Sequence, residues 1–343
     1  MYVLVANAGS SSLKLRLLDP ADQVVSTVDL DGAAGAAEIA DFAAGLSQVD
    51  AVGHRIVHGG RDFAGPVLID GGVRDAIAGL AELAPLHQPK GVAGIDAVRK
   101  ALPDLPAVAC FDTAFHHDLP AAAATYALPR EWNQRYGLRR YGFHGLSHGH
   151  IARTVGGRRI VSCHLGAGAS LAAIHNGRSV DTTMGFTPLE GLVMATRSGS
   201  VDPGLLLWLQ RHAGIDADRL EHVLEHESGL TGLSGSGDLR EAGEAAFEVY
   251  VHRLRREIAA MAAALDGLDV LVFTGGVGEH DPRVRAAAAL GHLGIAIDPD
   301  RNAAATGDAD ISAAGAPVRT LVRTAREDLE IARQVRTVLR GRG

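Results

Sequence analysis

Cysteine, lysine and aromatic residues are scarce in this chain. Its two cysteines, Cys110 and Cys163, are too few for a disulfide framework and lie in apolar runs typical of buried strands. Aromatic residues make up 4% of the chain, whereas Ala and Gly are abundant, so helices are expected to pack closely through small side chains. The chain has no long apolar span and no basic, apolar leader at its N-terminus. These absences predict a cytoplasmic protein with reduced thiols.

The net charge and the chain length indicate which class of protein this is. The net charge of −7 argues against nucleic acid or an acidic membrane as the main partner. A content of 47% hydrophobic and 21% charged residues is ordinary for a globular enzyme, and 343 residues favour two domains. Lysine occurs only at positions 14, 90 and 100. Lys14 is therefore noteworthy, because it lies in a serine-rich turn.

That turn, residues 7–14, lies between two apolar runs at 2–6 and 15–18. The pattern predicts a β-hairpin. Its tip carries hydroxyl groups, an amide side chain, close backbone N–H groups and the Lys14 ammonium. Such a turn suits an anion with many oxygen atoms, because small residues let donors converge on it. The alternative is an ordinary polar hairpin turn.

A second hairpin has the same order of parts. An apolar run at 160–163 is followed by a Gly/Ser turn at 164–170 and a returning run at 171–174. We interpret this as a weak internal repeat, which predicts two similar domains with a cleft between them. A turn from each domain could then hold part of a phosphate chain.

A third small-residue turn, residues 274–279, follows the continuous apolar run 268–273. Glycine-rich turns at the carboxyl ends of strands are where α/β sheets bind nucleotides. Strands and helices alternate throughout the sequence, which predicts an α/β fold.

Two arginines and one aspartate are candidate site residues. Arg55 lies between two histidines and before a double glycine, and Arg197 lies in a small polar loop. Guanidinium groups bind carboxylates and phosphates through two parallel hydrogen bonds. Asp112, at the end of an apolar run, could hold or orient a cation. The alternatives are surface ion pairs for the arginines and a cap for Asp112.

The sequence also contains features of two other chemistries. The 16 histidines raise the possibility of a metalloenzyme, but no His-Glu-x-x-His motif and no cysteine pair support a zinc site. Residues 145–149 match the nucleophile elbow of serine hydrolases. A triad in the right chain order would be Ser147, Asp202 or Asp238, and His292. Residues 139–143 make a poor buried strand, however, so Ser147 is better interpreted as a helix cap.

Taken together, the motifs resemble one family, the acetate kinases of the acetate and sugar kinase/Hsp70/actin superfamily. The resemblance extends over nearly the whole chain, and many separate motifs occur in order. They are the segments 7–14, 53–60, 83–87, 111–116, 141–145, 184–191 and 273–279. The chain departs from the usual motifs at Ala167, at His280, and at Ala325 and Arg326.

The resemblance implies two actin-like, ribonuclease H-like domains with a nucleotide cleft between them. The first domain would be residues 1–150, completed by the C-terminal helix 327–343, and the second 151–326. Closure of the cleft would exclude water and disfavour ATP hydrolysis. The family also suggests a homodimer.

The implied reaction moves the γ-phosphoryl group of ATP to acetate, giving acetyl phosphate and ADP reversibly by direct in-line transfer. Mg²⁺ or Mn²⁺ would assist. The implied partners are acetate or another short carboxylate and ATP/ADP, with no nucleic acid or membrane. One alternative is a propionate or butyrate kinase, because one methylene changes binding by only about 1–3 kcal/mol. Another is a non-catalytic ATPase on the same fold.

The resemblance also assigns site residues. Arg55 and Arg197 would hold acetate and the moving phosphoryl group, and His144 would donate a hydrogen bond to it. Asp112 would orient Arg55 or position the substrate. Asn7 and Glu327 would lie around the metal, directly or through water. The substrate site would be formed by Arg55, Val57, Leu86, His87, Phe143, Pro188 and Arg197. The nucleotide would contact Ser10, Ser12, Lys14, His164, Gly166, Gly168, Asp238, Arg240, Gly275, Gly276, Val277, Gly278 and Glu279.

Overall fold

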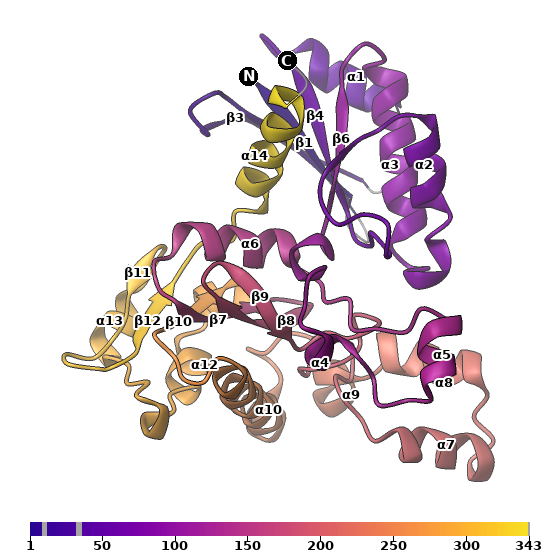
Figure 1. Ribbon diagram of the computed structural model, residues 1–343. Helices are drawn as coiled ribbons and strands as arrows, with labels where there is room; N and C mark the ends of the chain where they lie inside the picture. Colours follow the sequence, from indigo (N-terminus) through magenta and orange to yellow (C-terminus); the bar gives the residue numbers. More distant parts are fainter. Residues whose placement is uncertain (9–11, 32–35, 342–343) are drawn as a thin grey trace. The chain divides into compact units, whose positions relative to one another are not determined.

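A computed structural model describes residues 1–8, 12–31 and 36–341, which form two compact units (Figure 1). The first unit contains residues 1–118, 143–150 and the C-terminal segment from 326. The second unit contains residues 119–142 and 151–325. Each unit is built around its own six-stranded sheet.

The sheet of the first unit has the order β3-β2-β1-β4-β6-β5. Three antiparallel strands form one half, β4 and β6 continue it in parallel with β1, and β5 is an antiparallel edge. The predicted hairpin is therefore confirmed, with Asn7 directly opposite Lys14. The strands are β1 Val3–Ala8, β2 Ser12–Leu18, β3 Val24–Asp31, β4 Ala51–Ile56, β5 Val67–Leu68 and β6 Ala107–Phe111.

Helices cover both faces of this sheet, as Figure 1 shows. Helix α14 (Glu327–Arg340) packs Ile331, Ala332 and Val335 on one face, while α1, α2 and α3 cover the other. The backbones approach closely at Gly53, where an added Cβ would lie 2.5 Å from Ile331 Cγ2. The other helices of this unit are α1 Ala36–Ala44, α2 Gly71–Ala78, η1 Ala81–Leu83, α3 Gln88–Ala101 and η2 Ala114–His116.

The sheet of the second unit has the order β11-β12-β10-β7-β8-β9. Its predicted hairpin is confirmed by the antiparallel pair β7 and β8, and β10 runs parallel to β7. Helix α10 (Gly243–Ala264) packs against β7, β8 and β9 and buries one face that includes Tyr250, Leu254 and Ile258. The strands are β7 Arg159–Leu165, β8 Ala169–His175, β9 Arg178–Thr182, β10 Val270–Thr274, β11 Ala309–Asp310 and β12 Arg319–Val322.

The other helices of the second unit lie between and after these strands. They are α4 Ala121–Ala124, α5 Arg130–Arg135, α7 Pro203–His212, α8 Ala217–His226, α9 Gly229–Ser234, α11 Gly275–His280, α12 Pro282–Ala287, η3 Gly291–Leu293 and α13 Pro299–Ala304. Helix α6 (Gly145–Thr154) contributes residues to both units.

The two sheets have one topology. Reading each from its hairpin edge gives β3-β2-β1-β4-β6-β5 and β9-β8-β7-β10-β12-β11, so every strand has a counterpart of the same direction. The predicted α/β class and two actin-like domains are confirmed by this repeated order. The strands β9 and β3 were not expected, because their sequences lack a continuous apolar run.

Two predicted boundaries need correction. Residues 119–142 were placed in the first domain, but they belong to the second unit. Polar contacts explain this: Tyr126 and Arg140 both bond the Glu190 carboxylate, and Tyr141 N donates to Gly185 O. The helix for which Ser147 was predicted as the cap starts at Gly145, so Ser147 lies inside it.

Both cysteines are buried and free, as expected from their apolar surroundings. Burial raises the pKa of each thiol well above its ordinary value, so neither is a reactive thiolate. In the described part of the chain, no helix combines the length and apolar character needed to cross a membrane.

Candidate functional site

The best-defined polar cluster of the first unit joins three predicted site residues at the carboxyl ends of β1, β4 and β6. Arg55 Nε and Nη2 donate to Asp112 Oδ2 at 3.0 and 2.7 Å. Arg55 Nη1 donates to Asn7 Oδ1 at 3.2 Å. The Asp112 side chain is only 1% exposed and that of Arg55 19%. The guanidinium is therefore held in one orientation by groups from neighbouring strands.

The electrostatics of this cluster keep Arg55 charged. Burial lowers the pKa of Arg55, but the negative charges of Asp112 and Glu327 outweigh burial, and its pKa lies above the ordinary value. Glu327 is the first residue of α14. The predicted metal residues Asn7 and Glu327 thus both act on Arg55, one by a hydrogen bond and one by its charge.

His144 is placed next to this cluster by its backbone. It has a left-handed conformation with φ of +56°, which is rare for a residue with a side chain. The following amide, Gly145 N, donates to Asp112 O at 2.8 Å, and a Cβ on Gly145 would lie 2.1 Å from that oxygen. Only glycine allows this approach, so the loop that carries His144 is fixed beside Asp112.

The predicted substrate residues of the first unit differ in exposure. Phe143 is buried, with its ring at an edge-on distance of 5.5 Å from His58. Val57 is half-buried, and His87 is the residue before α3 (Gln88–Ala101). Leu86 is 40% exposed, so it lies at the surface of the unit. The remaining two, Pro188 and Arg197, belong to the second unit.

Arg197 is also oriented by a carboxylate, one that sequence reasoning missed. Its Nε donates to Glu225 Oε2 at 2.7 Å, and both side chains are largely buried. The backbone carbonyl of Glu225 accepts from Thr196 Oγ1 at 2.7 Å. Glu225 lies on α8 in a strongly polar sequence, where it cannot be told from a solvated residue. Its role comes from the packing of α8 against the loop.

The loop that carries Pro188 is braced by a second polar network. Glu190 accepts hydrogen bonds from Tyr126 Oη and Arg140 Nη2, both at 2.7 Å. Tyr126 Oη in turn accepts from Phe186 N at 2.8 Å. Burial raises the pKa of Tyr126 and its bond to Glu190 adds to this, so the phenol stays a donor. These contacts fix both ends of the segment around Pro188.

The second unit contains a cavity of about 710 Å³ at the Gly-rich turn that follows β10. Its lining includes five residues that were predicted to bind nucleotide: Gly166, Asp238, Arg240, Gly276 and Val277. It also includes residues that were not predicted: Ala167, Ala195, Leu230, Gly237, Leu239, Tyr250, His280, Asp281, Pro282 and Arg283. Five other predicted nucleotide residues of the second unit are not part of this lining: His164, Gly168, Gly275, Gly278 and Glu279.

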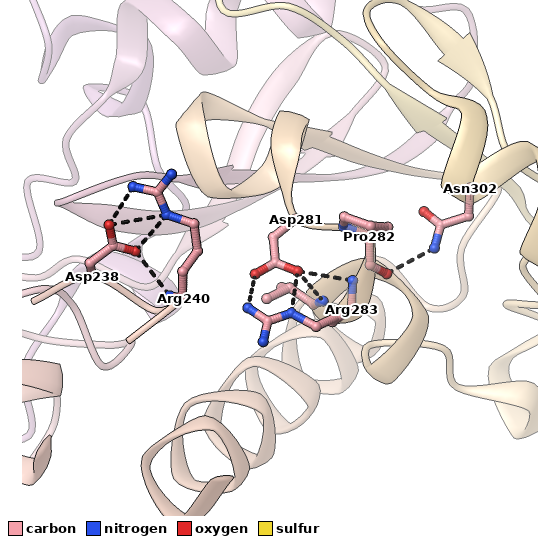
Figure 2. A network of polar contacts seen from close by, with 7 residues as sticks. Asp238, Arg240, Asp281, Pro282, Arg283 and Asn302 are labelled. Carbon is pink, nitrogen blue, oxygen red and sulfur yellow. Dashed lines mark hydrogen bonds and ion pairs between the residues drawn. The ribbon is translucent and has the colours of Figure 1, made fainter. Parts of the chain in front are cut away.

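Two Asp–Arg pairs border the cavity. Figure 2 shows the hydrogen bonds within each pair. Arg240 is bonded to Asp238, which also accepts from Arg240 N at 2.9 Å. The bonds from Arg240 lower the pKa of Asp238 to about 2. Arg283 forms the same pair with Asp281, donating from Nη2 at 2.7 Å. Each aspartate is thus ionised and occupied, and each arginine is oriented.

The Glu279 carboxylate accepts two backbone hydrogen bonds, one of them from its own helix α11. Its Oε1 accepts from Gly275 N at 3.0 Å and from Ala325 N at 2.9 Å. The carboxylate therefore frames the turn after β10 and joins it to residue 325. A direct nucleotide contact, as predicted, would compete with these two bonds.

Other predicted residues can be placed only in part. Lys14 is exposed on β2, across from Asn7. Ser12 begins β2, whereas Ser10 lies outside the described residues. His164 lies near the end of β7, opposite Ser170, and Gly168 O accepts from Gly166 N in the turn between the strands.

The serine hydrolase alternative fails on structural context. Ser147 is buried inside α6, and the described residues before this helix, 138–144, contain no strand. A nucleophile elbow requires a strand, a sharp turn and an exposed serine. Asp202 is occupied as the cap of α7, and Asp238 is paired with Arg240.

Two units of one actin-like topology, oriented arginines and a strand-end cavity define an α/β phosphotransferase of the actin-like kinase class. The sequence model of the acetokinase family matches residues 33–333. The chain belongs to this family, and the resemblance seen in the motifs is confirmed.

Individual relatives agree. An acetate kinase of Trichormus variabilis is 51% identical over 310 residues, covering 84% of this chain and 76% of that protein. The crystal structure of Porphyromonas gingivalis acetate kinase superposes with a TM-score of 0.90 at 35% identity, covering 98% of this chain and 99% of that one. A propionate kinase from Francisella tularensis also gives 0.90, at 33% identity, covering 97% and 98%.

Proposed function

We propose that this enzyme transfers the γ-phosphoryl group of ATP to acetate, giving acetyl phosphate and ADP, and that the reaction is reversible. The observation that carries the proposal is the largely buried, carboxylate-oriented guanidinium of Arg55 at the strand ends of an actin-like unit. Membership of the acetokinase family supports it. An oriented guanidinium suits a carboxylate substrate and a phosphoryl group equally well.

The proposed chemistry is a direct in-line transfer. A carboxylate oxygen of acetate attacks the γ-phosphorus, the bond to the β–γ bridging oxygen breaks, and ADP leaves with that electron pair. An anion attacks an anion here, so positive groups must offset the repulsion. Arg55 and Arg197 supply that charge, and His144 donates a hydrogen bond to the transferred group. Asp112 and Glu225 hold the two arginines in place.

We propose that the two units close around the substrates and bring Arg197 to the group that Arg55 and His144 hold. The 710 Å³ cavity of the second unit would take the adenosine, with Asp238 and Arg240 at its border. The turns at 7–14 and 164–170 would take the phosphates. Closure excludes water, which favours transfer over hydrolysis.

A divalent cation, Mg²⁺ or Mn²⁺, fits the donor set of the first unit. Asn7 offers an amide oxygen and Glu327 a carboxylate beside Arg55, and hard cations prefer such oxygen ligands. When bound, the ion neutralises charge on the phosphates. Asn7 has a second task, since its oxygen also receives the Arg55 hydrogen bond.

A propionate kinase is the second candidate, favoured by the similarity to the Francisella tularensis structure. We propose that Val57, Leu86, Phe143 and Pro188 contact the acyl chain. An apolar pocket separates acids that differ by one methylene by only about 1–3 kcal/mol, so acetate and propionate would both react.

The test of the proposed function is a trap for acyl phosphates. Protein, MgATP and acetate are incubated with hydroxylamine, and we expect acetohydroxamate to form in proportion to the enzyme. Replacing acetate by propionate or butyrate defines the acceptor. Replacing ATP by pyrophosphate defines the phosphoryl donor. Reactions without protein or without acetate are the controls. If no hydroxamate forms with any of the three acids, the proposal of a carboxylate kinase is contradicted.

We further propose a homodimer in which helix α7 is part of the interface. The helix has no buried residue in the described chain, although its sequence is strongly apolar. Leu205, Leu207 and Trp208 are 46%, 50% and 54% exposed. Apolar faces of this kind are usually covered by another protein surface, and a second copy is the partner that the family suggests.

Sedimentation equilibrium tests the dimer. We expect a mass twice that of the 35.7 kDa chain for the wild type, and a shift toward the monomer for Trp208→Glu. Gln210→Glu adds the same charge to the same helix outside the apolar set and is expected to remain dimeric. A monomeric wild type, or a Trp208→Glu variant that stays dimeric, would contradict an interface at α7.

We also propose a cytoplasmic location. The support is the pair of free, buried cysteines, which suits a reducing compartment.

A further inference from the structure

Arg285 is the least exposed arginine or lysine residue of the described chain, and the proposed reaction does not use it. The residue is 1% exposed. Among the described residues, no carboxylate forms a hydrogen bond or ion pair with it. Its hydrogen-bond partners are neutral oxygen atoms, and burial lowers its pKa more than the negative charge of Asp281 raises it. Burying a cation that has no carboxylate bonded to it is costly, so the contacts it makes require an explanation.

Those contacts converge on the end of α11 (Gly275–His280). Arg285 Nη1 donates to Gly278 O at 3.0 Å and to Glu279 O at 2.7 Å. Terminal carbonyl groups of a helix lack partners within the helix and carry its negative dipole end, so a cation stabilises them. The opposite end of α11 is held by Glu279 Oε1, which accepts from Gly275 N. The turn after β10 is thus anchored at both ends.

Asn302 extends the anchor to the next helix. Its Oδ1 accepts from Arg285 Nε at 2.7 Å, and its backbone carbonyl accepts from Arg285 Nη2 at 2.9 Å. Its Nδ2 donates to Pro282 O at 2.8 Å, a bond drawn in Figure 2. Arg285 and Asn302, here called the 285–302 clamp, therefore join α11, the start of α12 and α13.

The anchored segment is one wall of the nucleotide cavity. Gly276, Val277, His280, Asp281 and Arg283 all line it and all lie within the stretch that the clamp fixes. His280 and Asp281 follow directly after the carbonyl groups that Arg285 binds. A shift of these carbonyls would move the Asp281–Arg283 pair, and with it the shape of the cavity.

We propose that the 285–302 clamp is a positioning device that sets the wall of the nucleotide cavity for the phosphoryl donor. This inference rests on the proposed function. The planar guanidinium is needed because it spans Gly278, Glu279 and both oxygens of Asn302 at once. A lysine ammonium keeps the charge but lacks this fixed fork, so it cannot bridge the same four oxygens.

The experiment compares Arg285→Lys and Asn302→Asp with the wild type. Asn302→Asp keeps oxygen acceptors for Arg285, loses the donor to Pro282 O and adds a negative charge beside the guanidinium. Arg301→Lys, an exposed neighbour on α13, is the control. Steady-state kinetics give KM for ATP and for acetate separately, and calorimetry gives the dissociation constant of MgADP. Folding of each variant is checked by circular dichroism at the assay temperature.

We expect Arg285→Lys to raise KM for ATP and the dissociation constant of MgADP by about 10-fold or more, because small displacements of binding groups are costly. KM for acetate should stay within about 2-fold, since acetate depends on other residues. Asn302→Asp should show a smaller change of the same kind, and Arg301→Lys none.

A purely structural residue would change stability without this split. Equal changes in both KM values, or unchanged MgADP affinity in a folded Arg285→Lys or Asn302→Asp variant, would overturn the inference. If Arg285→Lys does not fold, the MgADP affinity of Asn302→Asp decides. A wild type that binds MgADP without phosphorylating a carboxylate would contradict the proposed function alone, because the affinities still test the clamp. A wild type that binds no nucleotide would overturn both.

Discussion

Arg197→Leu is expected to lower kcat for acyl phosphate formation by about 10³-fold or more, because arginines that stabilise a transferring phosphoryl group contribute on this scale. Leucine replaces the apolar part of the arginine side chain but carries neither its positive charge nor its hydrogen-bond donors. The effect should appear mainly in kcat, since the charge on the phosphoryl oxygens develops in the transition state. KM for ATP should change little, because Arg197 lies outside the lining of the nucleotide cavity.

The measurement is steady-state kinetics with the hydroxylamine trap, together with thermal unfolding to confirm the fold. Arg178→Leu is the control, since Arg178 is an exposed arginine of the same unit at the start of β9. It should have wild-type kcat. Near-normal turnover by Arg197→Leu would remove Arg197 from the mechanism.

Asp112→Ala is expected to reduce both activity and stability. The variant leaves the Arg55 guanidinium without its carboxylate in a site where Asp112 is 1% exposed. Breaking a buried ion pair by removing one partner costs about 3–5 kcal/mol, and partial exposure of Arg55 places the expected loss at the low end. Activity should fall in parallel, because Arg55 loses its fixed orientation. Urea unfolding and kcat measure the two effects.

A double variant separates the two roles of this pair. Arg55→Met with Asp112→Leu replaces both charges by apolar side chains, and such replacements are often neutral for stability. We expect the free energy of unfolding to recover while the enzyme stays inactive. A double variant that regains turnover would show that Arg55 takes no part in the reaction, whereas unchanged stability in Asp112→Ala would show that the pair is not a structural contact.

Local patterns account for much of what could be predicted. The two hairpins and the C-terminal helix each depend on a run of neighbouring residues, whereas the segment predicted as a Gly-rich turn after 268–273 forms the short helix α11. Their apolar periodicity and turn chemistry depend on consecutive residues. The motifs around Arg55, His144 and Arg197 could be recognised for the same reason. The error at residues 119–142 arose because their unit is decided by Glu190 and Gly185, far along the chain.

The supporting residues could not be read in this way. Glu225, Asp281, Arg283 and Arg285 carry no local signal, since charged residues in helices are most often solvated. Glu225 became recognisable only when α8 met the loop of Arg197. Arg285 became recognisable only from the hydrogen bonds that its guanidinium donates to carbonyl groups of α11.

The sequence by itself determined the α/β class, the repeated hairpins, the acetokinase motifs and the candidate charged groups of the proposed site. Tertiary structure alone decided which carboxylates orient the arginines, which residues wall the nucleotide cavity and which unit holds residues 119–142. The physical reason is distance along the chain. Hydrogen-bond periodicity and turn chemistry act between neighbours, whereas an ion pair such as Arg55–Asp112 joins positions 57 residues apart and exists only after the strands have paired.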